Sequence, residues 1–242
     1  MFHRLRRAGF DLAMQNHAGA ILAVDFPQAE QELEDALLAL RIPVDELIRG
    51  GGGEALSTQR LRNALAGAHW RKHEFVIQTI VDGEAKEATS HEIDHVRRLP
   101  AGVVALEIEW NNKDPFFDRD LENFQRLHAG GAISVGIVVT RGATLQANIE
   151  ARVRARVADT VEDFDQLIAA FDLEPTRRQR DAVLRRMETQ GVDFATAWAN
   201  RFVADKFGSA TTHWAKLETR IARGVGNPCP LVLIGIPDRV LD

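Results

Sequence analysis

Apolar and polar residues follow a strand-like pattern through three consecutive stretches near the middle of the chain. The first, 75–81, is rich in β-branched residues, and the Asp82-Gly83 pair that follows it is typical of a tight hairpin turn. The chain then returns over 86–96 and, after a second turn, enters another apolar stretch, 103–110. The pattern predicts three consecutive antiparallel strands.

A helix and a buried strand are predicted next. Apolar residues recur at helical spacing over 114–128, where Asp114 can cap the helix and Pro115 can occupy its first position. The run 133–140 is short and almost continuously apolar, which is typical of a strand buried on both faces. A helix between two strands implies a crossover to a parallel neighbour.

Outside this region the periodicity predicts mainly helices. These are expected over 1–18, 28–40, 44–48, 57–67 (capped by Ser57), 144–158, 161–171, 175–187, 194–202 and 211–223 (capped by Thr211 or Thr212). Strands are expected over 18–26 and 231–236. The predicted fold is α/β, with a mixed sheet of about five or six strands flanked by helices in one domain spanning 1–242.

A run of four glycines occupies positions 50–53. Such a run could cradle a phosphate, but the Lys-Ser/Thr pair that follows the glycines of a P-loop is missing. We therefore expect an ordinary flexible loop.

Composition narrows the class of protein. The chain has 242 residues, of which 27% are charged and 45% hydrophobic, as in ordinary globular proteins. No apolar run reaches the roughly 18 residues of a membrane span, and no secretory signal is visible, so a cytoplasmic location is expected. The single cysteine, Cys229, excludes an intrachain disulfide and a cysteine-rich zinc site. The net charge of −5 does not mark a nucleic-acid binder, although the local charge decides this.

Two acids stand one residue apart in an apolar strand, Glu107 and Glu109, and Asp94 lies in the strand before it. Because side chains alternate along a strand, Glu107 and Glu109 share the face of Val103 and Ala105. Carboxylates crowded on such a face are costly to bury unless a cation or a proton offsets their repulsion. The alternative is a solvated sheet face, on which both glutamates pair with Arg or Lys.

A hard divalent metal is the natural cation for such a site, since it prefers oxygen ligands. Held by carboxylates, it can activate water and stabilise the charge on a phosphodiester. Asp94 and Glu107 would then be metal ligands, the Ile108 carbonyl a further oxygen ligand, and Glu109 either a ligand or the general base. A zinc site using the neighbouring histidines His91 and His95 is disfavoured, because strand alternation separates adjacent side chains.

The residues around these acids resemble a known family. Ile93-Asp94 and the segment 104–121, Val-Ala-Leu-Glu-Ile-Glu-Trp-Asn-Asn-Lys-Asp-Pro-Phe-Phe-Asp-Arg-Asp-Leu, closely resemble the BglII/BstYI family of type II restriction endonucleases. That family is similar to BamHI and belongs to the PD-(D/E)XK nuclease superfamily. The superfamily pattern usually ends in lysine where this chain has Glu109, but BamHI-like enzymes also carry glutamate there.

The resemblance implies a homodimer that surrounds double-stranded DNA and cuts a short palindrome with Mg²⁺, leaving staggered ends with 5′-phosphates. It implies that Asp94 and Glu107 bind metal, and it leaves the general base unsettled. In relatives the segment after the catalytic strand contacts bases, a position that Asn112 occupies beside Asn111. Asparagine can bind an adenine edge through two hydrogen bonds, although an Asn-Asn pair also ends strands at ordinary turns.

Further DNA contacts are expected from the second half of the chain. Four residues at a predicted helix start could bind phosphates or base edges, or simply cap the helix: Ser209, Thr211, Thr212 and His213. The catalytic core is expected at about 74–141. The helical segment at about 144–223 would contribute DNA contacts or dimerisation. The arginines at 152–156 and 177–186 of this segment could instead lie on ordinary solvated helix faces. The alternatives to a restriction enzyme are a structure-specific repair or junction nuclease and a non-catalytic DNA-binding protein.

Overall fold

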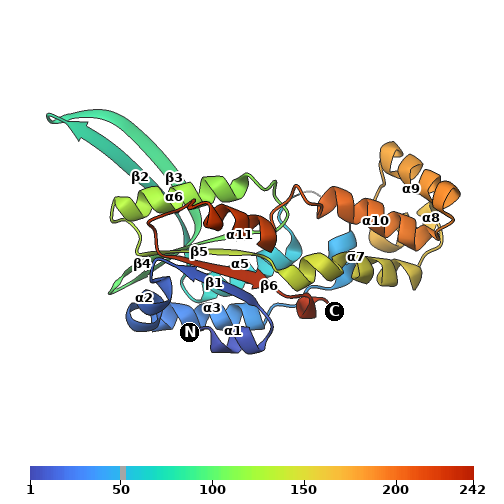
Figure 1. Ribbon diagram of the computed structural model, residues 1–242, viewed down its shortest axis with the longest axis horizontal. Helices are drawn as coiled ribbons and strands as arrows, with labels where there is room; N and C mark the ends of the chain where they lie inside the picture. Colours follow the sequence, from blue (N-terminus) through green and yellow to red (C-terminus); the bar gives the residue numbers. More distant parts are fainter. Residues whose placement is uncertain (50–52) are drawn as a thin grey trace.

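One six-stranded mixed sheet organises the protein (Figure 1). The computed structural model describes residues 1–49 and 53–242, so the first three glycines of the four-glycine run lie outside the described residues. The strand order is β1-β6-β5-β4-β3-β2. The strands are β1 (Asp11–Gln15), β2 (Arg71–Val81), β3 (Glu84–Leu99), β4 (Gly102–Glu109), β5 (Val135–Arg141) and β6 (Leu231–Ile236).

Helices cover both faces of the sheet (Figure 1). On one side lie α1 (His3–Arg7), α2 (Ala18–Asp25) and α3 (Pro27–Leu38), and on the other α6 (Phe116–Ala129) and α11 (Trp214–Ala222). The remaining helices are α4 (Val44–Ile48), α5 (Leu56–Gly67), α7 (Ala143–Ala158), α8 (Phe164–Phe171), α9 (Arg177–Gln190), α10 (Phe194–Lys206) and the 3-10 turn η1 (Asp238–Val240). Helices α8, α9 and α10 extend beyond the end of the sheet.

The sequence predicted the central topology correctly. β2, β3 and β4 form an antiparallel meander, and β4 pairs in parallel with β5 after the crossover through α6. β6 is parallel to β5, and β1 pairs with it in antiparallel register. β5 and β6 are buried along their whole lengths, because helices cover both faces there.

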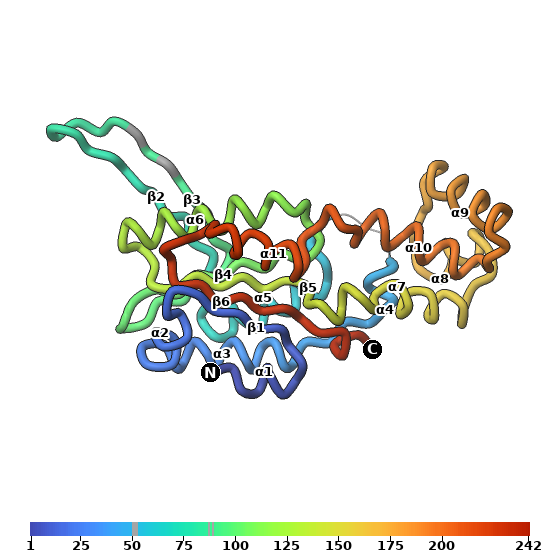
Figure 2. Tube along the Cα trace, in the orientation of Figure 1, coloured from blue at the N-terminus to red at the C-terminus, as the bar shows by residue number. Residues whose placement is uncertain are grey.

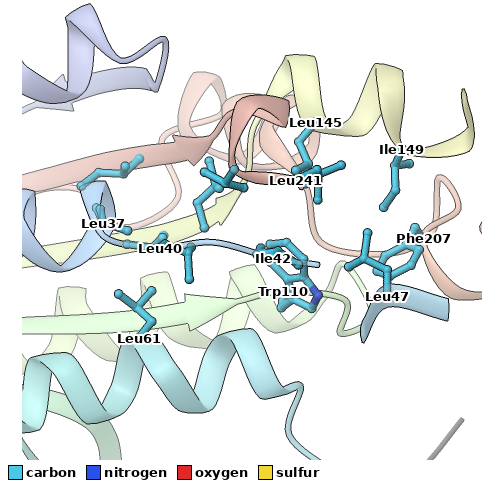
Figure 3. Close-up of a cluster of buried hydrophobic side chains, with 14 of the residues drawn as sticks. Leu37, Leu40, Ile42, Leu47, Leu61, Trp110, Leu145, Ile149, Phe207 and Leu241 are labelled. Carbon is cyan, nitrogen blue, oxygen red and sulfur yellow. The ribbon is translucent and has the colours of Figure 1, made fainter. Parts of the chain in front are cut away.

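Alternation along β4 divides its side chains between two hydrophobic cores, as predicted. Val104, Leu106 and Trp110 belong to the larger core, whereas Ala105 packs in the smaller core beneath α6 and α11. Figure 3 shows Trp110 among buried side chains of the larger core, which ties the end of β4 to the 42–47 segment. The strand end that carries the two glutamates is thereby fixed from the face opposite to them.

The β2–β3 hairpin forms an arm that projects from the body of the protein (Figure 2). Asp82 and Gly83 make its turn with positive φ angles of 53° and 83°, which is the conformation that the Asp-Gly pair predicts. Towards the tip, Val76 and Ile80 are 65% and 64% exposed. The hydrophobic pattern of this strand therefore does not reflect burial in a core along its outer half.

Two predictions near the N-terminus were wrong. The segment 1–18 is not one helix, because the chain turns at Gly9, with a φ of 77°, and continues as the edge strand β1. The apolar run predicted as a strand over 18–26 is the helix α2. A short apolar run has no periodicity that separates a strand from a buried helix.

The predicted caps were also wrong. Ser57 lies inside α5 and is buried, whereas the residue at the N-cap position is Ala55. Pro115 takes the N-cap position of α6, and the carboxylate of Asp114 instead pairs with two cations of α11. His213, rather than either threonine before it, precedes α11. No helix in the described residues is long and apolar enough to cross a membrane.

Candidate active site

Asp94 and Glu107 come together on neighbouring strands. His95 of β3 pairs with Leu106 of β4, which places the preceding Asp94 beside the following Glu107. The pairing of the two strands ends there, so their carboxylates lie where the strands separate. Both line a cavity of about 460 Å³ that reaches Arg119 and Asn123 of α6. The structure thus brings together the two acids that the sequence predicts as metal ligands.

Glu107 is buried, with 6% of its surface exposed. Burial raises its pKa well above the ordinary value, and the negative charges of Asp120, Asp94 and Glu109 raise it further. Arg119 acts in the opposite direction. A carboxylate in this position gains strongly from a second positive charge.

Glu109 is also buried, and its carboxylate faces two groups. Asn112 Nδ2 donates to Glu109 Oε2 at 2.7 Å, and Asp120 of α6 is in contact on the other side. Burial, together with the charge of Asp120, raises the pKa of Glu109 to about 8. The backbone is held too, because Thr140 Oγ1 donates to the Glu109 carbonyl at 2.7 Å.

Asp120 is an acid of this centre that the sequence analysis missed. It is 1% exposed, and burial raises its pKa. Its signal in the sequence is an acid beside the apolar positions Phe117, Leu121 and Phe124 of an amphipathic helix, all of which are fully buried. Asp120 therefore faces the sheet with them.

Arg119 is the cation of this cluster. Its Nη2 lies 2.7 Å from Asp120 Oδ1 and 3.7 Å from Glu109 Oε1, and its guanidinium covers the ring of Phe116. About half of the Arg119 side chain is exposed, at 55%. The solvated-face alternative is therefore wrong for Glu107 and Glu109, since both are buried even though an arginine lies beside them.

Lys72 is a second cation that the sequence did not reveal. It lies in β2 at a register shift against β3, between the pairs Arg71–Val96 and His73–Ile93. Bulges of this kind redirect side chains at functional sites. Lys72 Nζ contacts Glu92 Oε1 at 2.6 Å and Asp94 Oδ1 at 3.6 Å, and the contact with Glu92 raises the pKa of the lysine.

The chemistry of these donors fits a hard divalent cation. Four carboxylates supply oxygen ligands, and Asp120 Oδ2 is buried without a hydrogen-bond partner. In the described residues no three His, Cys, Asp or Glu side chains are arranged around a common point that could hold an ion. Side-chain rotations would therefore accompany binding, since Lys72 attracts Asp94 and Asn112 holds Glu109.

The Ile108 carbonyl, the other predicted metal ligand, and the two histidines of the disfavoured zinc site have different surroundings. Ile108 lies in β4 opposite Val139, past the last pair of β4 with β3. His91 and His95 are both buried, and their ring nitrogens include atoms without a partner among the described residues. Burial is the main cause that lowers the pKa of each histidine.

A larger cavity of about 600 Å³ adjoins the acids. It lies between α5 and the end of β4, and Asp94, Asn111 and Asn112 line it. Three cations also face it, namely Arg62, Arg71 and Lys72. Two acids of the lining, Glu54 and Asp94, pair with Arg62 and Lys72, so the cavity keeps a small excess of positive charge although the whole chain is acidic.

The structure also brings the 207–213 segment next to the two asparagines. Thr212 N donates to the Asn112 carbonyl at 2.8 Å, and Thr211 pairs with Lys113. Ser209 is exposed, Thr211 and His213 are half-buried, and Thr212 is fully buried, so Thr212 holds the segment in place in this conformation.

Buried Arg141, at the end of β5, fixes the 207–213 segment. Its Nη2 donates to Thr211 Oγ1 and to the Thr212 carbonyl, both at 2.6 Å, and its guanidinium covers the Phe207 ring. Among the described residues no carboxylate pairs with it, and burial lowers its pKa to about 9. Burial of this cation is unfavourable, and the hydrogen bonds that hold the 207–213 segment beside Asn112 offset part of that free energy.

A family model described as "Restriction endonuclease BglII/BglIII" matches residues 10–236. The chain belongs to this family. It is a type II site-specific deoxyribonuclease, its substrate is DNA, and its fold is restriction-endonuclease-like. Restriction endonucleases generally use a divalent metal, in agreement with the oxygen donors found here. The predicted family, fold class and enzyme class are confirmed.

Proposed function

We propose that the protein is a Mg²⁺-dependent homodimer that cuts both strands of a short palindrome and leaves 5′-phosphate ends. The observation that carries this proposal is the position of Asp94 between two cavities, one that it lines with Glu107 and one that it lines with Asn111 and Asn112. Buried Glu109 is joined to this group by the hydrogen bond from Asn112. The cluster supplies acids for hydrolysis, and the asparagines lie where a bound duplex would present its bases. We also propose that the core belongs to the PD-(D/E)XK superfamily.

Asp94 and Glu107 would hold the metal, with the Ile108 carbonyl as a further oxygen ligand. When bound, the metal supplies an activated water and stabilises charge on the phosphoryl oxygens. Glu109 is suited to accept a proton from the attacking water, because its pKa of about 8 lies near neutrality. Lys72 and Arg119 are placed to bind phosphate oxygens at the rim of the two cavities.

Asn112, Asn111 and the 207–213 segment would contact the bases and the adjacent backbone. Asn112 Nδ2 is engaged with Glu109 and would have to turn to bind an adenine edge. Ser209, Thr211 and His213 are accessible to DNA, while Thr212 would act through the backbone hydrogen bond that positions Asn112.

The helical segment 144–223 is proposed to contribute phosphate contacts or the dimer interface. Helix α9 carries five arginines, and Arg177 is almost fully exposed, at 96% of its side chain. If α9 binds phosphates, replacing Arg177 and Arg178 by alanine should weaken the salt dependence of DNA binding. If it forms the interface, the same change should lower the mass of the protein in solution.

A plasmid digest with sequencing of the cut ends tests the proposal. Wild-type protein with Mg²⁺ should give discrete fragments, one palindromic site and 5′-phosphates, and Glu107→Ala should bind the same DNA without cutting it. Cleavage only at branched or damaged DNA would favour a repair or junction nuclease. A monomeric mass both free and on DNA would contradict the dimer.

A further inference from the structure

One oxygen of the acidic cluster has no partner. Asp120 is 1% exposed, and its Oδ2 forms no hydrogen bond within the described part of the chain. Buried polar atoms in folded proteins are almost always satisfied, so an open carboxylate oxygen requires an explanation. Asp120 Oδ1, in contrast, accepts a hydrogen bond from Arg119 Nε at 2.9 Å.

The surroundings of this oxygen are strongly acidic. Asp120 is in contact with Glu109, and its charge acts on Glu107 more strongly than that of Asp94 does. Both glutamates are buried. Three buried carboxylates thus lie close together with one neighbouring arginine. Such an arrangement is unfavourable unless protons or a further cation offset the repulsion, and a divalent cation would do so with the carboxylates ionised.

Arg119 has the properties of a replaceable counter-ion. Its Nε and Nη2 both contact Asp120 Oδ1, at 2.9 Å and 2.7 Å, and Glu109 Oε1 lies 3.7 Å from Nη2. Its side chain is 55% exposed, and the cavity shared by Asp94 and Glu107 reaches it. The guanidinium can therefore swing out towards solvent or a phosphate without disturbing the core.

We infer that Asp120 is an additional carboxylate ligand of the divalent metal site, and that Arg119 is the counter-ion that the metal displaces. The inference rests on the proposed metal dependence of the enzyme. It extends the predicted ligand set from the strands β3 and β4 to the helix α6. Divalent hard cations take six or more oxygen ligands, so an additional carboxylate is readily accommodated.

Calcium and magnesium binding without DNA provides the test. Isothermal titration of full-length Asp120→Asn should show at least a tenfold loss of affinity for either ion. Without metal, the variant should melt at a temperature no lower than that of wild type, because the substitution removes a charge that repels its neighbours. Glu122→Gln, an exposed acid of the same helix, is the matched control and should bind as wild type does. Arg119→Ala should bind the ions several-fold more tightly, which a purely structural role of this arginine does not predict.

Wild-type affinity in Asp120→Asn, or weaker binding in Arg119→Ala, would overturn the inference. If Asp120→Asn does not fold, the displacement of Arg119 can still be tested in the wild-type protein. The Nε–Hε signal of Arg119 should shift during a Ca²⁺ titration with the same midpoint as binding, and an unchanged signal would rule out displacement. Failure of the proposed function gives a different result: wild-type protein with Mg²⁺ then leaves DNA intact, whether or not Asp120→Asn changes metal affinity.

Discussion

Replacing Glu109 by glutamine should stabilise the metal-free protein at alkaline pH. The folded-state pKa of Glu109 is about 8, against an ordinary value of 4.5, and burial is the main cause. Below pH 4.5 the carboxyl is protonated in both the folded and the unfolded protein. Between pH 4.5 and about 8 the folded protein loses stability relative to the unfolded chain, because only the carboxyl of the unfolded chain ionises there; above pH 8 both ionise and the loss is complete.

The size of the effect follows from the two pKa values. Each pH unit between them is worth about 1.4 kcal/mol, so ionisation of Glu109 costs the folded state about 5 kcal/mol above pH 8. Asp120 is in contact and competes for the same proton, so removing one acid relieves only part of this cost. We expect Glu109→Gln to recover about 2–3 kcal/mol at pH 8.5 and much less at pH 5.5.

Urea unfolding with a chelator at both pH values measures this difference. Glu122→Gln is the control, since Glu122 is exposed on the same helix and pairs with Arg126. Wild type and control should lose stability with rising pH, Glu109→Gln should lose clearly less, and Mg²⁺ should restore much of the wild-type loss. The same pH dependence in all three proteins would refute the argument that Glu109 is protonated in the folded state.

Three other substitutions test separate parts of the structure. Arg141→Met should cost about 2–4 kcal/mol in urea unfolding, because buried acceptors of the 207–213 segment lose their donor; unchanged stability would argue against its anchoring role. Asn112→Ala should lower single-turnover cleavage at least tenfold, because Glu109 loses its hydrogen bond and the proposed base contact is removed; a wild-type rate would exclude both roles. Gly136→Ala should destabilise by about 1–3 kcal/mol in thermal or chemical unfolding, because its Cβ would lie 2.6 Å from a buried phenylalanine ring; an unchanged midpoint would show that the ring yields freely.

Strand alternation was sufficient to predict much of the site. The two glutamates of β4 share a face because their spacing is two, and Asp94 lies beside Glu107 because a hairpin and a turn fix the order of the meander. These are local rules that tertiary packing did not override. The family resemblance supplied the remaining step, from a pair of acids to a nuclease.

Other parts of the site depend on features that no local pattern encodes. Lys72 reaches Asp94 from a register shift in β2, and the sequence gives no sign of where such a shift falls. Asp120 approaches Glu109 only because α6 packs at one angle on the sheet. Arg141 lies in an apolar strand, and its role depends on a segment about 70 residues away in the chain.

The hydrogen bond between Asn112 and Glu109 limits how the DNA sequence specificity of the enzyme can be altered. The side chain predicted to face a base is one contact away from an acid predicted to take part in cutting. Selection for a new target sequence through substitutions at position 112 will therefore also change the reaction rate. Variants with relaxed specificity and full speed should arise instead from Ser209, which is exposed in the 207–213 segment that Thr212 links to the Asn112 carbonyl.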